Sequence, residues 1–471
     1  MIRIKPCYMD GRWIDTGGRD VRELVNPATE EIYGQVALGT DEDVERAVAA
    51  ARRACPSFAA TRREERLSLL ENILAAYRRH YEEFVAAITL EMGAPVTLSR
   101  EAQAAAGPDQ LEATIAALAA MEPVRRIGNA AIHREAIGVC GLITPWNWPI
   151  SQIVCKVAPA LAAGCTMVLK PSEMTPYSAE LFARVLEEAG VPPGVFNLVH
   201  GDGRTVGSAL AAHPGIDMVS FTGSTAAGIE VAIRAAPTVK RVCQELGGKS
   251  PNILLPDADF EHAVPQAVAM CMDNTGQSCN APTRLLVPQA RHDEVLAMAE
   301  AAARKLIVGD PQDPATEIGP LASAIQFERV RRHIDAGSRE GAVLVTGGDM
   351  AGQQRGYFMA PAIFGAVRPS MSIAQEEIFG PVLAVMPYRD EAEAIAIAND
   401  TRYGLSAYVS SADTERALRV AARLRAGNVH INGAALEASA PFGGYRQSGN
   451  GREQGVFGIE EFTEVKAVIM A

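Results

Sequence analysis

The chain has 471 residues, of which 48% are hydrophobic and 21% charged, and its formal net charge is −12. This length predicts two or three domains with an ordinary globular composition. The acidic balance excludes a broad basic surface for nucleic acid or anionic membranes. No apolar run is long enough to cross a membrane, and no secretory leader opens the sequence.

Eight cysteines are scattered along the chain, and none forms a Cys-x-x-Cys pair. This usage fits a large protein with reduced thiols better than a disulfide scaffold, so a cytoplasmic location is expected. The eight histidines show no His-Glu-x-x-His or clustered Cys/His spacing, and no zinc site is expected.

The first part of the chain is expected to be helical, beginning with a cap at Thr40-Asp41-Glu42-Asp43. Further helices are expected over 62–77, 80–93 and 109–120. Two extended pieces, 127–134 and 462–469, have no helix of their own and could pair with each other or with another subunit.

Short apolar runs then alternate with helical segments, which predicts a parallel sheet with helices on both faces. The expected strands span 139–143, 167–169, 195–199, 218–221 and 242–246. A second α/β stretch begins near residue 252. Its expected strands span 253–255, 285–287, 343–346, 382–387, 407–409 and 429–432.

Polar groups follow the middle strands where each strand ends. Asn147, Lys170, Glu173, Gly223-Ser224 and Glu245 all take such positions. Because ligands bind at the carboxyl ends of parallel strands, these groups are expected to converge on one edge.

Gly223-Ser224 opens a helix, and its free N–H groups would suit a phosphate, although Ser224 could be a plain N-cap. The Gly201-x-Gly203 turn is set aside because it lacks the full dinucleotide-binding spacing. Lys170 and Glu173 form either a solvated pair or a grip on an adenosine ribose. A carboxylate there favours NAD over NADP, while the lysine acts in the opposite direction.

Cys279 lies in a polar, glycine-containing loop, unlike the cysteines inside apolar runs. A thiolate in such a loop attacks an aldehyde carbon once its pKa is lowered, and the alternative is an incidental surface thiol.

Six segments resemble those of the NAD(P)-dependent aldehyde dehydrogenase superfamily, in the family's order and across nearly the whole chain. They are Pro-Trp-Asn-Trp-Pro at 145–149, Phe-Thr-Gly-Ser at 221–224, Glu-Leu-Gly-Gly-Lys at 245–249, Gly-Gln-Ser-Cys at 276–279, Glu-Ile-Phe-Gly-Pro at 377–381 and Pro-Phe-Gly-Gly at 441–444. The resemblance implies an α/β fold with a Rossmann-like cofactor domain (1–118 and 137–248), an α/β catalytic domain (249–450) and a small β oligomerisation unit (119–136 and 451–471). It also implies a homodimer or homotetramer.

The resemblance further implies that Cys279 forms a thiohemiacetal, with Asn147 and the Cys279 backbone N–H as oxyanion donors. Glu245 would then act as general base on the thioester. Lys156 would tune the site, unless it is only the end of an amphipathic helix. Glu453 would join the same proton network.

By similarity, the cofactor contacts would include Glu377 at the nicotinamide ribose, Phe379 beside the nicotinamide, and Thr144, Trp146 and Gly247 in the cleft. Without the resemblance, Glu377 would belong to a charged loop and Trp146 to the core.

Departures from the family pattern concern the substrate. Many members carry Met and Trp at the positions of Gln152 and Cys155, and segment 432–440 has no aromatic residue. With Ser278 and Asn280 beside the nucleophile, these changes predict a roomy tunnel for a bulky, aromatic or functionalised aldehyde.

Three other functions stay open at this point. A CoA-acylating relative would generally lack Glu245, and a thiol hydrolase would need no nucleotide site. A structural or binding protein that has lost catalytic activity would not need Cys279, Glu245 and Asn147 together.

Overall fold

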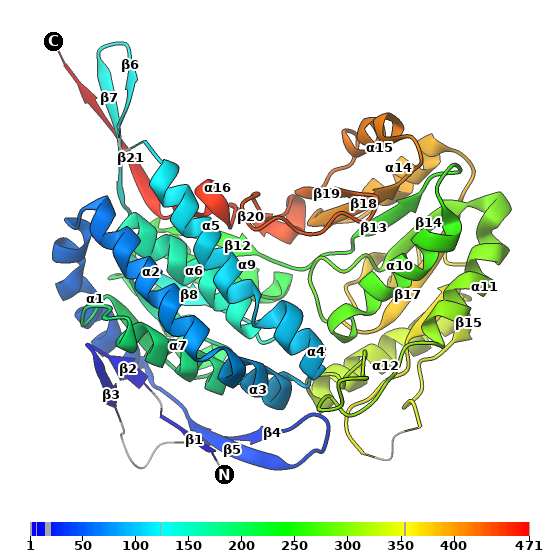
Figure 1. Ribbon diagram of the computed structural model, residues 1–471, viewed down its shortest axis with the longest axis horizontal. Coiled ribbons are helices and arrows are strands. Elements are labelled where there is room, and N and C mark those ends of the chain that lie inside the picture. The colour runs from blue at the N-terminus through cyan, green and yellow to red at the C-terminus, as the bar shows by residue number, and fades with distance from the viewer. Residues whose placement is uncertain (1, 6, 15–19, 123, 353–354, 471) are drawn as a thin grey trace.

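The computed structural model describes residues 2–5, 7–14, 20–122, 124–352 and 355–470. Two large sheets lie in the two halves of the molecule, each flanked by helices, and a narrow three-stranded arm projects from the first half (Figure 1). This arrangement confirms the expected α/β class. Within the described ranges, no helix is both long enough and apolar enough to span a bilayer.

The first sheet has eight strands in the order β20-β12-β11-β8-β9-β10-β2-β3. The five central strands run parallel, as predicted, and β2, β3 and β20 are antiparallel additions at the edges. The strands are β2 (Cys7–Met9), β3 (Arg12–Ile14), β8 (Val139–Ile143), β9 (Thr166–Lys170), β10 (Phe196–Val199), β11 (Met218–Thr222), β12 (Arg241–Glu245) and β20 (Gly449–Asn450). The carboxyl ends of the central strands therefore meet at one edge.

Helices cover both faces of this sheet, because each presents an apolar stripe to it. On one face lie α2 (Arg63–Arg79), α3 (Tyr81–Met92), α5 (Ala106–Ala120), α6 (Pro149–Ala163) and α7 (Pro176–Glu188). On the other lie α1 (Asp41–Ala59), α8 (Ser208–Ala212) and α9 (Thr225–Ala235). The expected cap of α1 is present, since the Thr40 backbone N–H donates to the Asp43 carboxylate at 2.8 Å.

The second sheet has seven strands in the order β15-β16-β17-β14-β13-β18-β19, and all its pairs are parallel except β15 with β16. The strands are β13 (Pro251–Leu254), β14 (Arg284–Pro288), β15 (Val343–Thr346), β16 (Ala362–Gly365), β17 (Val382–Tyr388), β18 (Ser406–Ser410) and β19 (Asn428–Ile431). Its helices are α10 (Phe260–Met272), α11 (His292–Ala303), α12 (Ala324–Arg339), α13 (Ser372–Gln375), α14 (Glu391–Asn399) and α15 (Thr414–Ala421).

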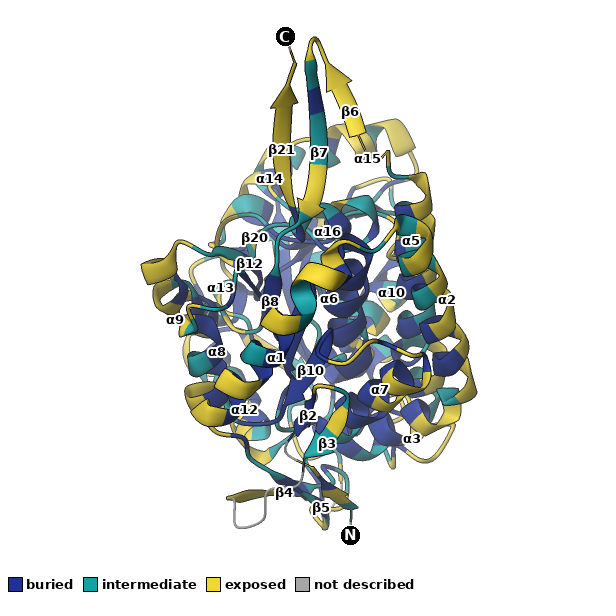
Figure 2. Cartoon of the chain, turned by 90° about the vertical axis from the view of Figure 1, so that its left-hand side faces the viewer, coloured by how far each residue is buried: buried dark blue, intermediate teal, exposed yellow. Residues whose placement is uncertain are grey.

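The arm consists of β6 (Val124–Ile127), β7 (Ala130–Ala136) and β21 (Thr463–Ile469). β21 pairs antiparallel with β7, from Thr463 opposite Ala136 to Ile469 opposite Ala130. The two extended pieces left open by the sequence thus pair with each other. β6 and β21 are exposed along almost their whole length (Figure 2).

The sequence pattern did not predict the strands before residue 40. β1 (Ile2–Ile4), β4 (Val21–Val25) and β5 (Ile32–Ala37) form a separate small sheet. Three of the five residues of β4 are exposed, so this strand shows no apolar alternation that would have revealed it.

Candidate active site

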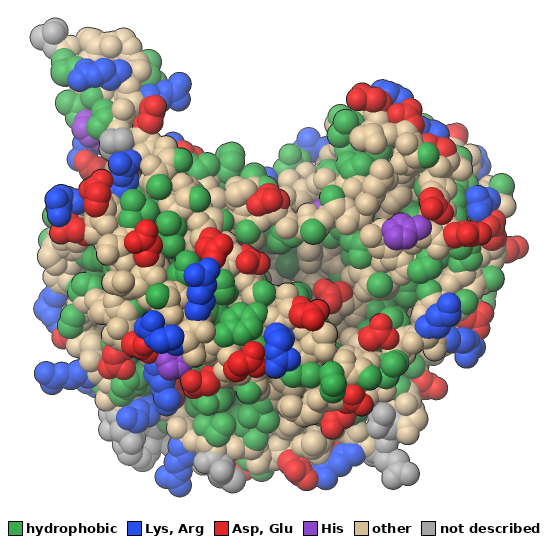
Figure 3. Space-filling view, viewed as in Figure 1, with side chains coloured by type: hydrophobic (Ala, Val, Ile, Leu, Met, Phe, Trp, Pro, Cys, Tyr) green, Lys and Arg blue, Asp and Glu red, His purple; other side chains and the backbone are tan. Residues whose placement is uncertain are grey.

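A cleft of about 630 Å³ opens between the two sheets, where the surface of the molecule is hollowed (Figure 3). Nine of the residues expected at the site line it: Trp146, Asn147, Gln152, Gly223, Ser224, Gly247, Cys279, Glu377 and Phe379. The loops after β8, β11 and β12 supply most of the first-half residues, helix α6 supplies Gln152, and the loop after α10 supplies Cys279. Residues that are far apart in the sequence therefore line the same cleft.

The loop that carries Cys279 has a strained backbone. After α10 ends, Asn274, Thr275 and Gly276 take left-handed φ values of 52°, 57° and 70° in succession. A Cβ at position 276 would lie 2.2 Å from the Gly380 carbonyl oxygen, so only glycine fits there. Such strain persists only where the surroundings enforce it, and it is typical of functional sites.

Side-chain hydrogen bonds enforce this loop conformation. The Gln277 amide oxygen accepts from the Ala322 N–H at 2.9 Å, and the Thr275 hydroxyl donates to the Gly319 carbonyl at 3.1 Å. Gln103, from the helical turn before α5, donates to the Asn274 side chain at 2.8 Å. The loop is therefore tied to both halves of the protein.

Asn147 is buried, and its amide nitrogen donates to the Gln277 carbonyl at 2.9 Å. Its own carbonyl accepts from the Asn274 amide at 2.9 Å. The expected oxyanion donor is thus bound to the nucleophile loop two residues before Cys279.

Cys279 is partly exposed at the cleft. Its low-dielectric surroundings, followed by the carboxylates of Glu245 and Glu377, raise the pKa of the thiol. In the free protein the thiol is therefore neutral and must be activated before it can attack a substrate.

Glu245 ends β12 and is 3% exposed. Neither of its carboxylate oxygens has a hydrogen-bond partner among the described residues. Burial and the nearby Glu453 carboxylate raise the pKa of Glu245 well above its ordinary value. A Cβ at Gly443 would lie 2.5 Å from Glu245 Oε1, so glycine there leaves the carboxylate its space.

Lys156 and Glu453 form a buried ion pair behind Glu245. The Lys156 ammonium also donates to the Ser220 hydroxyl at 3.1 Å, and the Cys155 thiol donates to Glu453 at 3.3 Å. Burial alone would lower the pKa of Lys156, but the adjacent Glu453 carboxylate outweighs it and the pKa is raised. Cys155, expected to line the substrate tunnel, is buried and lies next to this pair.

Glu377, Phe379 and Gly247 meet at one side of the cleft. Glu377 accepts from the Gly248 N–H at 3.1 Å, and a Cβ at Gly247 would lie 2.3 Å from its carboxylate. Phe379 has a left-handed φ of 62°. Its ring packs edge-on against the Trp146 ring, with the ring centroids 5.5 Å apart. A flat group could enter beside these rings.

A second, larger cavity of about 1390 Å³ lies at the same sheet edge, beside α9. Glu173 lines it and pairs with the Lys170 ammonium at 3.1 Å and with Arg22 at 3.4 Å. Burial would raise the pKa of Glu173, but Lys170 lowers it, so the carboxylate is charged. Gly203, from the turn set aside in the sequence, also lines this cavity.

Ser224 caps α9, and its hydroxyl accepts from the Ala227 N–H at 3.3 Å. Ser224 is therefore an N-cap and also lines the cleft. Thr144 is buried at the end of β8, and its backbone N–H donates to the Lys170 carbonyl at 3.1 Å. Thr144 does not line the cleft.

On the substrate side, Gln152 is 9% exposed and its amide oxygen has no partner among the described residues. Ser278 accepts from the Trp148 indole N–H at 2.8 Å. The Asn280 carbonyl accepts from the Tyr408 hydroxyl at 3.1 Å. Sequence reasoning missed Trp148, although it stands inside the quoted 145–149 segment.

Two further cleft residues, Gln326 and Arg329, were also missed. Both lie on α12, whose amphipathic pattern resembles any surface helix. Gln326 donates to the Phe379 carbonyl at 2.6 Å and Arg329 to the Glu377 carbonyl at 2.8 Å, so both hold the loop that carries Glu377 and Phe379.

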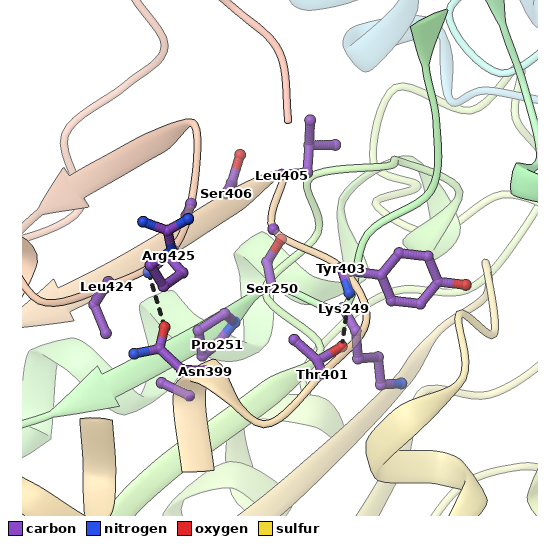
Figure 4. A pocket seen from close by; sticks show the side chains of 14 residues that line it. Lys249, Ser250, Pro251, Asn399, Thr401, Tyr403, Leu405, Ser406, Leu424 and Arg425 are labelled. Atoms are coloured by element: carbon purple, nitrogen blue, oxygen red, sulfur yellow. Dashed lines mark hydrogen bonds between the residues drawn. The ribbon is translucent and has the colours of Figure 1, made fainter. Parts of the chain in front are cut away.

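A separate pocket at the start of β18 is lined by Lys249 and by residues of the loops around 399–407 and 424–426 (Figure 4). Its edges are fixed by hydrogen bonds such as that from the Arg425 N–H to the Asn399 side chain, at 2.8 Å. Burial lowers the pKa of Lys249 to about 7. None of the expected catalytic residues lines this pocket.

Comparisons with known proteins agree with this geometry. Residues 13–468 match the model of the family described as "Aldehyde dehydrogenase family". A 3-succinoylsemialdehyde-pyridine dehydrogenase from a Pseudomonas species is 57% identical over 98% of both chains.

Solved structures show the same similarity. An aldehyde dehydrogenase mutant from Pseudomonas syringae, crystallised with NAD+ and octanal, is 52% identical, covers 99% of this chain and 96% of its own, and gives a TM-score of 0.97. A Mycobacterium tuberculosis aldehyde dehydrogenase complexed with NAD+ is 40% identical, covers 100% and 98%, and gives 0.97.

Proposed function

Since this chain belongs to the aldehyde dehydrogenase family, we propose that it oxidises an aldehyde to the corresponding carboxylate with NAD as the hydride acceptor. The observation that carries the proposal is the cleft in which Cys279 and Asn147 face Glu377 and Phe379. A thiol, an amide donor and a nucleotide site serve aldehyde oxidation together. A thiol hydrolase would have no use for the nucleotide site.

The residues that would hold NAD fit a dinucleotide. Glycine at 247 lets the backbone approach Glu377 closely, in a place that a Cβ would fill. The first turn of α9, after Gly223-Ser224, offers backbone N–H groups to a pyrophosphate. When bound, the nicotinamide accepts the hydride that leaves the substrate carbon.

Cys279 is the nucleophile in the proposed reaction. The partly exposed thiol gives its proton to water in the cleft. The sulfur then bonds to the aldehyde carbon, and the carbonyl oxygen becomes an oxyanion. Asn147 exchanges its bond to the Gln277 carbonyl for this oxyanion, together with the Cys279 backbone N–H.

Hydride loss from the adduct carbon leaves a thioester on Cys279. Glu245 then removes a proton from water, whose oxygen attacks the thioester carbon, and the carbon–sulfur bond breaks to release the carboxylate. A raised pKa makes Glu245 a stronger base for this step. Lys156 and Glu453, buried behind it, provide a route for the proton to leave.

Glu245 also separates this proposal from a CoA-acylating enzyme, in which CoA would take the acyl group and no base would be needed for water. The test measures NADH formation with a panel of aldehydes, with and without CoA. The proposal predicts CoA-independent NADH and a carboxylate product. A strict requirement for CoA, or NADH formation by a Cys279→Ala variant, would overturn it.

We also propose that the substrate is bulky, aromatic or otherwise functionalised. One relative is named for a pyridine-bearing semialdehyde, and another was crystallised with octanal. The free amide oxygen of Gln152 supports a polar contact at the cleft, and Ser278 and Asn280 flank the nucleophile. Equal kcat/KM values for acetaldehyde and benzaldehyde would contradict this preference.

The charged Glu173 at the second cavity supports NAD over NADP, because a carboxylate accepts from a ribose 2′-hydroxyl and repels a 2′-phosphate. Lys170 offsets part of this repulsion, so NADP would bind more weakly rather than not at all.

The proposed domains are a cofactor domain (1–118 and 137–248), a catalytic domain (249–450) and an oligomerisation unit (119–136 and 451–471). Val465 and Ile469 on β21 are 60% and 74% exposed, which supports assembly through the arm into a homodimer or homotetramer. Ile469→Lys should reduce the mass measured by light scattering. Ile325→Lys, at a residue 76% exposed on α12, is the matched control.

Eight free thiols support a cytoplasmic location.

A further inference from the structure

An aromatic pair in the second sheet lies directly behind the nucleophile. Tyr408 on β18 and His430 on β19 are register partners on neighbouring parallel strands, so their side chains share one face. Their rings stack with centroids 4.7 Å apart and planes 15° from parallel. Both residues are buried, with 6% and 9% of their surfaces exposed. The mechanism proposed above uses neither of them.

Tyr408 reaches the nucleophile loop. Its hydroxyl donates to the carbonyl of Asn280, the residue that follows Cys279, at 3.1 Å. Burial and the proximity of Cys279 both raise the pKa of Tyr408, so the hydroxyl keeps its proton and remains a donor. The side-chain bonds of Thr275, Gln277 and Ser278 hold the loop before the nucleophile. Tyr408 holds it just after.

His430 reaches a different segment. Its Nδ1 lies 2.9 Å from the Ala434 carbonyl oxygen, which can only accept, so this nitrogen carries the proton. Ala434 belongs to segment 432–440, which lacks aromatic residues. The neighbouring Gly433 has a φ of +74°, and a Cβ there would lie 2.2 Å from Gln266 of α10. This end of the segment therefore packs against the helix that leads to Cys279.

We propose that Tyr408 is a positioning residue for Cys279, and that His430, stacked on it, ties segment 432–440 to the nucleophile loop. The stack joins two segments that are distant in sequence through rings that have little freedom to move. Because the Tyr408 bond holds the peptide next to the nucleophile, its loss lets the sulfur drift from Asn147. Loss of the His430 bond instead releases segment 432–440, which the sequence predicts to border the substrate tunnel.

The inference rests on the proposed function and is tested by substitutions that keep an aromatic ring at each position. Tyr408→Phe removes only the hydroxyl and should lower kcat about tenfold with little change in KM, as expected for one lost buried hydrogen bond. His430→Phe keeps an aromatic ring in the stack but removes both ring nitrogens, and with them the bond to Ala434. It should raise KM for bulky aldehydes about fivefold, on the same grounds, with kcat nearly unchanged.

Tyr388→Phe is the matched control, since Tyr388 is also buried in the second sheet and its hydroxyl donates to a backbone carbonyl, that of Leu254, at 2.7 Å. It should change neither kinetic constant. A second readout is the rate of Cys279 alkylation by iodoacetamide, followed by peptide mass spectrometry without cofactor or aldehyde. Freeing the loop in Tyr408→Phe should speed alkylation, and Tyr388→Phe should leave it unchanged.

If Tyr408→Phe keeps the kcat and the alkylation rate of the unmodified protein, the inference fails while the dehydrogenase proposal stands. If none of the aldehydes tested leads the unmodified protein to form NADH, the proposed function fails. The alkylation rates then still decide whether Tyr408 positions Cys279.

Discussion

The Asn147 side chain donates to the Gln277 carbonyl at 2.9 Å, so the expected oxyanion donor and the nucleophile loop are bonded to each other before any substrate arrives. The same amide donor that would stabilise the adduct therefore also aligns the loop in the free protein. When substrate binds, the Asn147 amide only exchanges one hydrogen-bond acceptor for another.

Replacing Asn147 with alanine should lower kcat by about 10²–10³-fold, because one oxyanion donor is lost. Steady-state NADH formation measures the effect. Asn399→Ala is the control, since the Asn399 amide also donates to a backbone carbonyl, that of Arg423, at 3.0 Å but outside the cleft. An Asn147→Ala enzyme with full kcat would show that the oxyanion is stabilised elsewhere.

Glu245→Gln should stop turnover after the first acyl-enzyme forms, because the amide cannot accept a proton from water. The expected result is a burst of NADH followed by a rate reduced about 10²–10⁴-fold. Rapid-mixing absorbance measures both phases. A variant that shows neither burst nor turnover would place Glu245 in the acylation step instead.

The same substitution has a predicted pH signature in stability. The pKa of Glu245 is raised in the folded protein, so its contribution to stability is present at low pH and is lost as pH rises through that raised value. Glu245→Gln, which carries no charge, should therefore gain melting temperature relative to the unmodified protein as pH increases. Thermal melts from pH 5 to 9 test this, and parallel curves would contradict it.

Bound NAD+ should make Cys279 more reactive. Burial, followed by the carboxylates of Glu245 and Glu377, raises the thiol pKa, and a cationic nicotinamide ring held in the cleft would oppose them. Iodoacetamide should modify Cys279 several-fold faster with NAD+ than with NADH, whose ring is neutral. Equal rates with the two cofactors would mean that the ring charge does not reach the sulfur.

Glu173→Gln should relax cofactor choice, because it removes the charge that repels a 2′-phosphate at the second cavity. The KM for NADP should fall about tenfold or more while that for NAD rises modestly, as expected for one charged hydrogen bond. Glu187→Gln is the control, since Glu187 accepts from Trp13 outside that cavity.

Much of this site could be predicted from the sequence, for a physical reason. Asn147, Glu173 and Glu245 each follow an apolar run, and parallel strands place their ends at one edge. The partners that hold these groups could not be predicted. Gln103 and Tyr408 come from other elements, and nothing near them in sequence marks the contact. The small N-terminal sheet was missed because its strands bury too few apolar residues to show a pattern.

The pairing of β20 with β12 has a consequence for how the enzyme is made. Gly449 lies opposite Glu245 in that pairing, and Glu453 follows it to meet Lys156. A ribosome reaches these residues long after it has made the nucleophile. A nascent chain therefore carries Cys279 and Glu245, the proposed nucleophile and base, before Glu453 is made. The proposed proton path is complete only when synthesis has passed residue 453.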